Sequence, residues 1–435
     1  MDSIWTENIN MPHFQTLKGN IKTDVLIIGG GITGILCAYF LQKHGIDYVL
    51  AEGRTICSGT TKNTTAKITS QHGLIYHELL KNFGIERAKL YLEANQESVK
   101  RYAELCKHIE CDFQQKTSYV YSMDHRKKLE KEAWALGIMG YPIEFSETTE
   151  LPFSVAGAIG FPDQAQFHPL KFLSQISGNL KIYEHTFVKE LKEKEAVTEN
   201  GNITFQKIIF ATHFPIDNKH GMYFLKLYQH RSYVIALKNA KEFNGMYVDD
   251  AKEGMSFRNY KNLLLIGGGG HRTGKKGGNW IELRNFAETY YPEAREYSFW
   301  AAQDCITLDQ VPYVGKYSNR MVECYVATGF RKWGITSAMT AAIILTDMVL
   351  EKKSPYEEIY NPSRNMVKPQ LLFNTCESIK NLLTISKKRC PHMGCALKWN
   401  SAEHSWDCPC HGSRFDETGV LLNNPANGDL LHISK

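Results

Sequence analysis

Hydrophobic and polar residues along the chain follow two patterns, one of strand type and one of helix type. Near the N-terminus, an apolar strand at 24–28 leads into a glycine-rich turn, a helix at 35–44 and a second strand at 46–51. Later segments repeat both patterns. The further helices predicted are 76–108, 126–139, 169–177, 337–350 and a short one at 376–384; the further strands are 181–183, 186–188, 207–212, 232–238, 245–248, 256–259 and 262–266, with a hairpin across 200–201 and a turn at 267–272.

Composition narrows the class of protein. The chain has 435 residues, of which 43% are hydrophobic and 22% charged, so we predict a globular protein of two or three domains. Its net charge of +5 is spread along the chain in short basic groups without interleaved aromatic residues, which argues against nucleic-acid binding. No segment reaches about 18 uncharged apolar residues, and the N-terminus lacks a signal-like apolar core. We therefore predict a cytoplasmic protein without a transmembrane segment.

The glycine-rich turn follows the first strand directly and has the pattern G-x-G-x-x-G at Gly29, Gly31 and Gly34. The first glycine allows a tight turn, the second lets the backbone approach a pyrophosphate, and the third lets the helix pack closely on the sheet. Ile32 and Thr33 open that helix, whose free N–H groups can bind phosphate. The turn therefore predicts a dinucleotide site.

Glu52 ends the second strand, about 20 residues past the glycines, where an acid binds a ribose 2′-OH. NADP would favour a basic residue at this position, so the pattern favours FAD or NAD. A glycine-rich turn without a ligand is the alternative. This alternative is disfavoured, because the strand, the glycines, the helix, the second strand and the acid all occur at the expected spacing.

Three later segments have residue types suited to holding a cofactor ring. The segment 58–69 is rich in glycine and small hydroxyl residues, although an ordinary polar loop has the same composition. The strand 207–212 ends in Ala-Thr, and a second glycine-bounded helix start at 329–336 can aim N–H groups at the N1/C2=O edge of a flavin. The candidate cofactor-binding residues in and near these segments are Thr60, Thr61, Thr65, Ala66, Val188, Ala211, Thr212, Gly329, Trp333, Gly334, Ile335 and Thr336.

Taken together, these residues resemble those of a known family of flavin enzymes. Residues 20–350 are similar to the FAD-dependent amine and amino-acid oxidoreductases of the D-amino-acid oxidase or glycine-oxidase type, with the segment 309–315 adding to the motifs above. The resemblance implies FAD as cofactor and oxidation of a C–N bond by hydride transfer to flavin N5. Hydride transfer depends more on how the substrate is placed against the flavin than on a strong protein base. We therefore assign no catalytic residue. His213 stands where the family often has glycine.

Five charged side chains are candidates for positions near the flavin or a substrate carboxylate, although each alone is better explained as a surface charge. They are Lys67, His271, Arg272, Arg331 and Lys332.

The C-terminal segment has a metal-binding pattern: Cys390-x-His392, then 15 residues, then Cys408-x-x-His411. It resembles a Rieske [2Fe–2S] site, in which two thiolates hold one iron and two imidazoles the other. Zinc is the alternative, although its ligands more often follow C-x₂₋₄-C and H-x₃₋₅-H spacing. The same resemblance, to the cytochrome-bc type, implies a disulfide between Cys395 and Cys410.

The sequence departs from the Rieske pattern in two places, and each departure leads to a prediction, one on the cluster potential and one on the size and support of the lobe. Phe415 stands where related proteins often have a tyrosine that donates to a ligand sulfur, so we expect a potential toward the lower part of the Rieske range, with Ser413 as the remaining side-chain donor. Residues 352–389 hold few strand signals, so the lobe is shortened and is expected to rest on the flavin domain.

We therefore predict an α/β fold: a FAD-binding Rossmann-like domain of the glutathione-reductase type, an interleaved α+β substrate domain, and a small all-β Rieske-like lobe. The expected division is 1–75, 155–220 and 305–352 for FAD, 76–154 and 221–304 for substrate, 353–385 as linker, and 386–435 as the shortened Rieske domain.

The pairing of the two cofactors suggests a dehydrogenase. An amine or amino-acid-like substrate would reduce FAD, and the cluster would pass electrons singly to an unknown carrier, or in reverse from that carrier to the flavin. The arrangement resembles a family of two-part proteins, DAO-type oxidoreductases with a C-terminal Rieske domain. Two alternatives stay open: an oxygen-using amine oxidase with a structural cluster, and an electron-transfer or redox-sensing protein without a small-molecule substrate.

Overall fold

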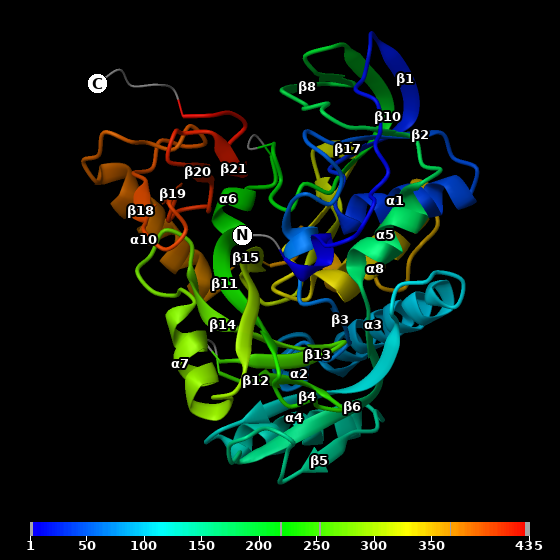
Figure 1. Cartoon of the computed structure of the whole chain (residues 1–435). Coiled ribbons are helices and arrows are strands. Elements are labelled where there is room, and N and C mark those ends of the chain that lie inside the picture. Colours follow the sequence, from blue (N-terminus) through cyan, green and yellow to red (C-terminus); the bar gives the residue numbers. More distant parts are fainter. Residues whose placement is uncertain (1–2, 218–219, 252–253, 366, 431–435) are drawn as a thin grey trace.

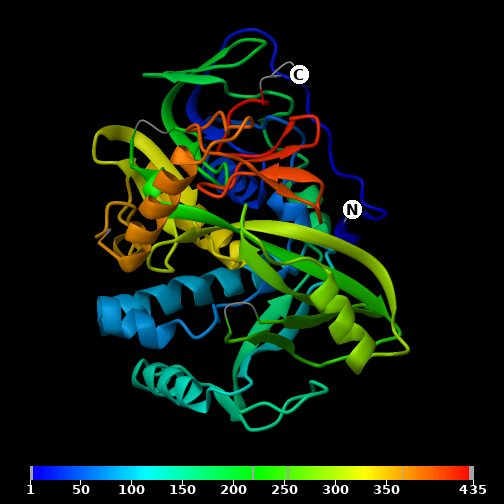
Figure 2. The ribbon, with the colours of Figure 1, turned by 90° about the vertical axis from the view of Figure 1, so that its left-hand side faces the viewer.

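The computed structural model describes residues 3–430 except 218–219, 252–253 and 366. Two large sheets and one small sheet organise the chain (Figure 1). The small sheet and the helix α10 form a lobe at the C-terminal end, which lies against both larger parts (Figure 2).

The first large sheet has eight strands and carries the N-terminal turn. Val25 and Ile27 of β1 join the core on one face, and Leu26 and Ile28 join the core on the other. A continuous apolar run is typical of a parallel strand that is covered on both faces. The strand order is β16 (Tyr313–Ser318), β17 (Met321–Thr328), β10 (Asn202–Phe210), β1 (Ile21–Ile28), β2 (Tyr48–Ala51) and β7 (Ile182–Tyr183), with β8 (Glu190–Lys192) and β9 (Glu195–Val197) beside β10.

Helices cover this sheet. The helix α1 (Ile32–Lys43) follows the glycine turn and packs against α8 (Gly334–Val349) and α5 (Pro169–Ser177). Most residues of α8 are buried, so it contributes to the core along nearly its whole length. Among the described residues, no helix is both long and apolar enough to cross a bilayer.

The second large sheet has nine strands and forms the wall opposite the glycine turn. Its longest strands, β11 and β15, pair antiparallel from Leu227–Thr307 to Lys238–Arg295. The strand order is β15 (Arg295–Thr307), β11 (Leu227–Lys238), β14 (Leu263–Arg272), β13 (Ser256–Tyr260), β12 (Met246–Asp249), β4 (Gln114–Ser122), β6 (Gly157–Gln166) and β3 (Lys67–Ile68), with β5 (Glu144–Ser146) beside β6. Its helices are α2 (Tyr76–Phe83), α3 (Ile85–Cys106), α4 (Arg126–Ile138), α6 (Tyr223–Lys226) and α7 (Ile281–Tyr290).

The C-terminal lobe has a short four-stranded antiparallel sheet. It follows α9 (Glu357–Tyr360) and α10 (Pro369–Leu383), so a 15-residue helix lies where the sequence predicts a linker with a short helix at 376–384. The strands are β18 (Lys398–Asn400), β19 (Ser405–Asp407), β20 (Arg414–Asp416) and β21 (Leu421–Asn423).

Three predicted elements differ from the structure. The helix 76–108 is two helices, because Gly84 with φ of +79° ends the first. The segment 186–188 is a loop, since Thr186 bonds to Glu52 and Leu17 outside any ladder. The predicted turn 267–272 is wrong: this segment continues β14 and pairs with β11 as far as His271 and Arg272.

The division into domains stays a prediction, but the strands within it can be placed. The strand β6 belongs to the nine-stranded sheet, although it lies in the predicted FAD segment 155–220. Most of β15 falls in the predicted substrate segment, as expected for this sheet, yet neither β15 nor β4 was predicted as a strand.

Candidate functional site: a shared cavity and a cluster lobe

A cavity of about 1400 Å³ lies between the two large sheets and reaches the C-terminal lobe. The glycine turn forms one end. Gly29 has φ of +108°, and a Cβ there would lie 2.5 Å from the Ala211 carbonyl oxygen. A Cβ on Gly34 would lie 1.9 Å from the Gly29 oxygen, so the helix start requires glycine. Gly31 faces the cavity, with Thr61 Oγ1 as the nearest atom, 3.2 Å from where a Cβ would stand.

Glu52 is already held by backbone groups. Its two carboxylate oxygens accept from the Gly30 N–H at 2.7 Å and the Arg54 N–H at 2.8 Å. Because a carboxylate has about four lone-pair sites, it can still accept from a ribose hydroxyl. Thr61 Oγ1 accepts from the Ile32 N–H at 3.1 Å, so this threonine caps α1.

Most of the predicted cofactor-binding residues line this cavity, and three lie behind its wall. Gly34 packs under the turn, and Ala66 is fully buried with its carbonyl oxygen 2.7 Å from Arg258. Thr336 exchanges hydrogen bonds with the backbone of Thr69 at 2.8 and 3.0 Å. The predicted residues that line the cavity are Gly29, Gly31, Ile32, Thr33, Glu52, Thr60, Thr61, Thr65, Val188, Ala211, Thr212, Gly329, Trp333, Gly334 and Ile335.

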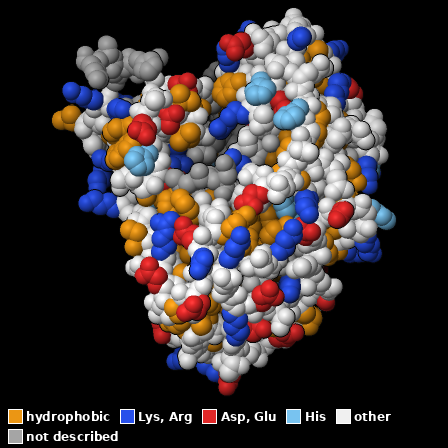
Figure 3. Space-filling view, viewed as in Figure 1, with side chains coloured by type: hydrophobic (Ala, Val, Ile, Leu, Met, Phe, Trp, Pro, Cys, Tyr) orange, Lys and Arg blue, Asp and Glu red, His pale blue; other side chains and the backbone are white. Residues whose placement is uncertain are grey.

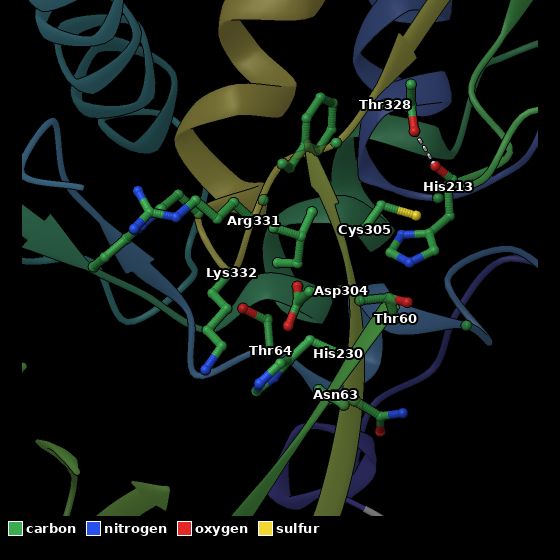
Figure 4. Close-up of a pocket in the computed structure, with 18 of the residues that line it drawn as sticks. Thr60, Asn63, Thr64, His213, His230, Asp304, Cys305, Thr328, Arg331 and Lys332 are labelled. Atoms are coloured by element: carbon green, nitrogen blue, oxygen red, sulfur yellow. Dashed lines mark hydrogen bonds between the residues drawn. The ribbon is translucent and has the colours of Figure 1, made fainter. Parts of the chain in front are cut away.

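Charged side chains line the part of the cavity next to the nine-stranded sheet. Asp304 of β15 and Lys332 of the turn after β17 point into it (Figure 4). Burial raises the pKa of Asp304 to about 6, although Lys332 and Arg231 lower it. Burial, with the nearby charge of Arg258, lowers the pKa of Lys67 to about 7. The cavity therefore holds two groups that can gain or lose a proton near neutral pH.

Of the charged candidates, Lys67, Arg331 and Lys332 line the cavity, whereas His271 and Arg272 do not. His271 bonds to the Tyr233 hydroxyl at 3.0 Å. Arg272 donates to the carbonyl oxygens of Pro409 and Cys410 at 3.2 and 3.1 Å, so it supports a cluster loop rather than a substrate.

His213 shows why glycine suits its position. The residue has φ of +67°, in the left-handed region that glycine adopts most easily. Its side chain lines the cavity, and burial lowers its pKa to about 4 despite a hydrogen bond with Gln229. The imidazole is therefore neutral at physiological pH.

The four predicted cluster ligands lie as two pairs on two loops of the lobe. The rings of His392 and His411 lie 4.9 Å apart, and the thiols of Cys390 and Cys408 are hydrogen-bonded to each other. Both ring nitrogens of His411 are buried and lack a hydrogen-bond partner of ordinary geometry. Burial first, then the charges of His392 and Arg272, lowers the pKa of His411 to about 3. A neutral, buried imidazole fits a metal ligand.

Cys395 and Cys410 lie beside the ligands. Their sulfur atoms and that of Cys408 are all within 4.8 Å of one another. All eleven cysteines lie among the described residues and are free thiols in this structure. The predicted Cys395–Cys410 disulfide is therefore not formed here, although the two side chains are in contact. It stays a prediction for the oxidised protein.

The two large sheets with their helices form the flavin-binding body. The lobe contacts this body through hydrogen bonds to backbone groups. Gln229 Nε2 donates to the carbonyl oxygens of His411 and Asn424, both at 2.9 Å. Asn424 Nδ2 donates to the oxygens of Thr212 and Phe214 at 2.6 and 2.8 Å. Residues 421–429 also supply part of the cavity wall. The lobe therefore rests on both larger parts: Thr212 and Phe214 belong to the predicted flavin segment, as expected, whereas Gln229 belongs to the predicted substrate segment.

Phe214 connects the cavity wall with the cluster ligands. It follows Ala211, Thr212 and His213, which line the cavity. Its ring centroid lies 6.2 Å from that of His392 and 6.3 Å from that of His411. The residue that follows the cavity-lining segment 211–213 therefore packs against both histidine ligands.

A buried group of charges fixes the lobe to β11. Arg231 forms an ion pair with Glu403, and Arg414 contacts Glu403 at 3.0 Å and Asp407 at 2.9 Å. The side chains of all four residues are at most 7% exposed. Sequence reasoning missed this group because its members are ordinary charged residues, and Arg231 and Glu403 lie 172 positions apart.

Comparisons with known proteins agree with this architecture. The family model described as FAD dependent oxidoreductase (DAO) matches residues 24–348, and the Rieske [2Fe-2S] domain model matches residues 363–433. The Rieske 2Fe-2S iron-sulfur protein YhfW of Bacillus subtilis is 34% identical over 496 aligned positions, covering 99% of this chain and 97% of that protein. The cytochrome b6-f complex iron-sulfur subunit of Nostoc punctiforme is 54% identical over 37 residues, which are 8% of this chain and 21% of that subunit.

Two solved structures share the fold of the larger part. Glycine oxidase from Geobacillus kaustophilus superposes with a TM-score of 0.67 at 18% identity, covering 79% of this chain and 99% of that one. L-proline dehydrogenase from P. horikoshii also gives 0.67 at 19% identity, covering 80% and 98%. The Rieske match favours an iron–sulfur cluster over zinc at the four ligands. The chain belongs to the DAO family of FAD-dependent oxidoreductases and carries a C-terminal Rieske [2Fe–2S] domain.

Proposed function

We propose that the protein is a dehydrogenase that oxidises an amine or amino-acid-like substrate and releases the electrons one at a time through the cluster lobe to a separate carrier. One observation carries the proposal: the glycine turn, the charged wall of the nine-stranded sheet and residues 421–429 of the lobe all line the same cavity. When bound, FAD supplies a two-electron acceptor and the cluster a one-electron carrier.

The charges of the cavity suit a substrate with both an amine and a carboxylate. Arg331 and Lys332 supply positive charge from the turn after β17, and Asp304 supplies a carboxylate from β15. Arg331 Nη1 bonds only weakly, at 3.4 Å, to the His72 carbonyl oxygen. A planar guanidinium has further donors, which can bind a substrate carboxylate in a bidentate manner.

The chain also supplies groups that can take a proton from the substrate. A protonated amine cannot release a hydride from its α-carbon, because the lone pair that stabilises the product is occupied. Asp304, with a pKa of about 6, and Lys67, with a pKa of about 7, are basic enough near neutral pH to accept that proton. Either group serves to hold the bound amine neutral.

The route for electrons follows the contacts between cavity and lobe. Residues 211–213 line the cavity, and Phe214 packs on both histidine ligands. Gln229 fixes the backbone of His411 relative to β11 at 2.9 Å. These contacts hold the cluster loops at a constant position against the cavity wall, as efficient electron transfer between two sites requires.

The test is anaerobic mixing of the holoprotein with a panel of amines and amino acids. Flavin bleaching and the EPR signal of the reduced cluster are followed in the same sample. The proposal expects one substrate class to produce both signals, and a Cys390→Ser variant without cluster to produce bleaching alone. Bleaching without cluster reduction, with peroxide formed in air in proportion to substrate, would instead indicate an oxidase with a structural cluster. No bleaching by any compound would indicate an electron-transfer or redox-sensing protein.

A further inference from the structure

The helix α10 carries its polar residues inward and its apolar residues outward. Asn374, Glu377 and Asn381 are at most 7% exposed and bond to groups of the body or to one another. Asn374 Oδ1 accepts from Arg272 at 2.9 Å, and Glu377 pairs with Lys275. Hydrogen bonds and an ion pair of the inward face therefore help to hold this helix in place.

The opposite face of α10 is an exposed apolar stripe. Leu372 is 70% exposed, Ile379 51% and Leu383 78%, and Ile385 just past the helix is 97% exposed. Positions 372, 379 and 383 share one face of a helix, because they are separated by seven and four residues. Phe373, 54% exposed, widens the stripe. Contiguous exposed apolar surface is typical of protein–protein and membrane interaction sites.

The surroundings of the stripe are strongly basic. Between Glu358 and Glu403 the chain has seven Lys and Arg residues and one acid, Glu377, which is buried. Lys and Arg side chains gather beside hydrophobic ones at the left edge of the face shown in Figure 3. The seven basic residues are Arg364, Lys368, Lys380, Lys387, Lys388, Arg389 and Lys398, and of these Lys380, Lys387, Arg389 and Lys398 are exposed.

We propose that α10 docks in the interface of an anionic lipid bilayer, with its axis parallel to the surface. The apolar stripe would enter the boundary between headgroups and acyl chains, and the exposed Lys and Arg residues would contact anionic headgroups. Charge complementarity selects this occupant, because a second copy of the chain would bring the same positive charge to the stripe. The proposal stands independently of the substrate.

Docking would bring the first cluster loop close to the bilayer. Arg389 donates to the Leu382 carbonyl oxygen at the end of α10 and to the Gly394 oxygen in the first cluster loop, at 3.2 and 2.7 Å. Met393, 38% exposed, lies next to the ligand His392 in that loop. This step rests on the proposed function: a carrier that reaches the first cluster loop here would belong to the class of electron carriers dissolved in the membrane.

The experiment is co-sedimentation of the holoprotein with vesicles of phosphatidylcholine alone or mixed with phosphatidylglycerol. The variant is Ile379→Glu with Leu383→Glu, and the matched control is Ile281→Glu on α7, where Ile281 is 59% exposed. The wild type and the control are expected to sediment with the anionic vesicles only. The double variant is expected to bind them about tenfold or more weakly, because it replaces two inserted apolar side chains with negative charges. Flavin absorbance and the cluster's EPR signal confirm that each variant is folded.

Three results would overturn the proposal. They are a wild type that stays in the supernatant, equal binding to both kinds of vesicle, and a double variant that binds as the wild type does. If the wild type instead self-associates without lipid and the double variant does not, the stripe is an interface between two copies.

Discussion

The Glu403→Gln substitution tests how strongly the cluster lobe is fixed to the flavin-binding body. It leaves Arg231 and Arg414 buried around a neutral amide, since their side chains are only 4% and 7% exposed. Removing one member of a buried ion pair typically costs about 3–5 kcal/mol, because the remaining charge stays desolvated. Whole domains are stable by about 5–15 kcal/mol, so the lobe should lose a large part of its stability.

The assay is thermal unfolding followed at wavelengths of the cluster and of the flavin. The variant should lose its cluster signal at a clearly lower temperature than its flavin signal, and reduction of the cluster after anaerobic flavin bleaching should slow. Glu417→Gln, in the same lobe at a side chain that is 67% exposed, is the control and should change neither quantity. A Glu403→Gln variant that unfolds like the control would refute the reasoning.

The pH dependence of cluster loss in the wild type is a second test of the Glu403 ion pairs. Burial alone would raise the pKa of Glu403, but Arg231 and Arg414 lower it more, so it lies below the ordinary value of 4.5. The stabilisation by the carboxylate is therefore complete above about pH 4.5 and is lost as the pH falls through the lowered pKa. Cluster loss in mild acid should show this step in the wild type and lack it in the variant.

Further predictions concern the cofactors and the substrate. Phe415→Tyr, at a buried position in the lobe core, should shift the cluster potential upward in a redox titration; no upward shift would count against the assigned role of this position. Gly34→Ala should yield protein with little bound flavin by absorbance, because the new Cβ would lie 1.9 Å from the Gly29 oxygen; normal flavin content would contradict this. Asp304→Asn should remove a rise through about pH 6 in the rate of anaerobic flavin bleaching at low substrate, and an unchanged pH profile would exclude Asp304 as the proton acceptor.

Local motifs were predictable from the sequence because their physics is local. The glycine turn needs a strand before it and a helix after it, and all three lie within 24–44. The cluster loops hold ligands two or three positions apart, so His392 and His411 were found from spacing alone. The fold class and the choice of FAD rested in addition on the resemblance of residues 20–350 to a known family.

Long-range contacts were not predictable in the same way. The run of glycines at 267–270 looks like a turn, but β11 keeps it in the sheet. A Cβ on Gly267 would lie 2.9 Å from Ser256 Oγ, and one on Gly268 would lie 3.0 Å from Leu283 Cδ2, so this strand has little room for side chains. The lobe contacts of Gln229 and Asn424 join residues 182 or more positions from their partners. The wall at 421–429 has no motif that sets it apart from a surface loop.

That wall has a consequence for how the protein is assembled in the cell. Residues 421–429 belong to the lobe that holds the ligands Cys408 and His411, and they also enclose the flavin cavity. Because a bound cofactor stabilises the fold that surrounds it, insertion of iron and sulfide should favour retention of the flavin. Under iron starvation, newly made protein would have a less stable lobe and a less completely enclosed flavin cavity. The supply of iron would therefore limit the assembly of both redox centres.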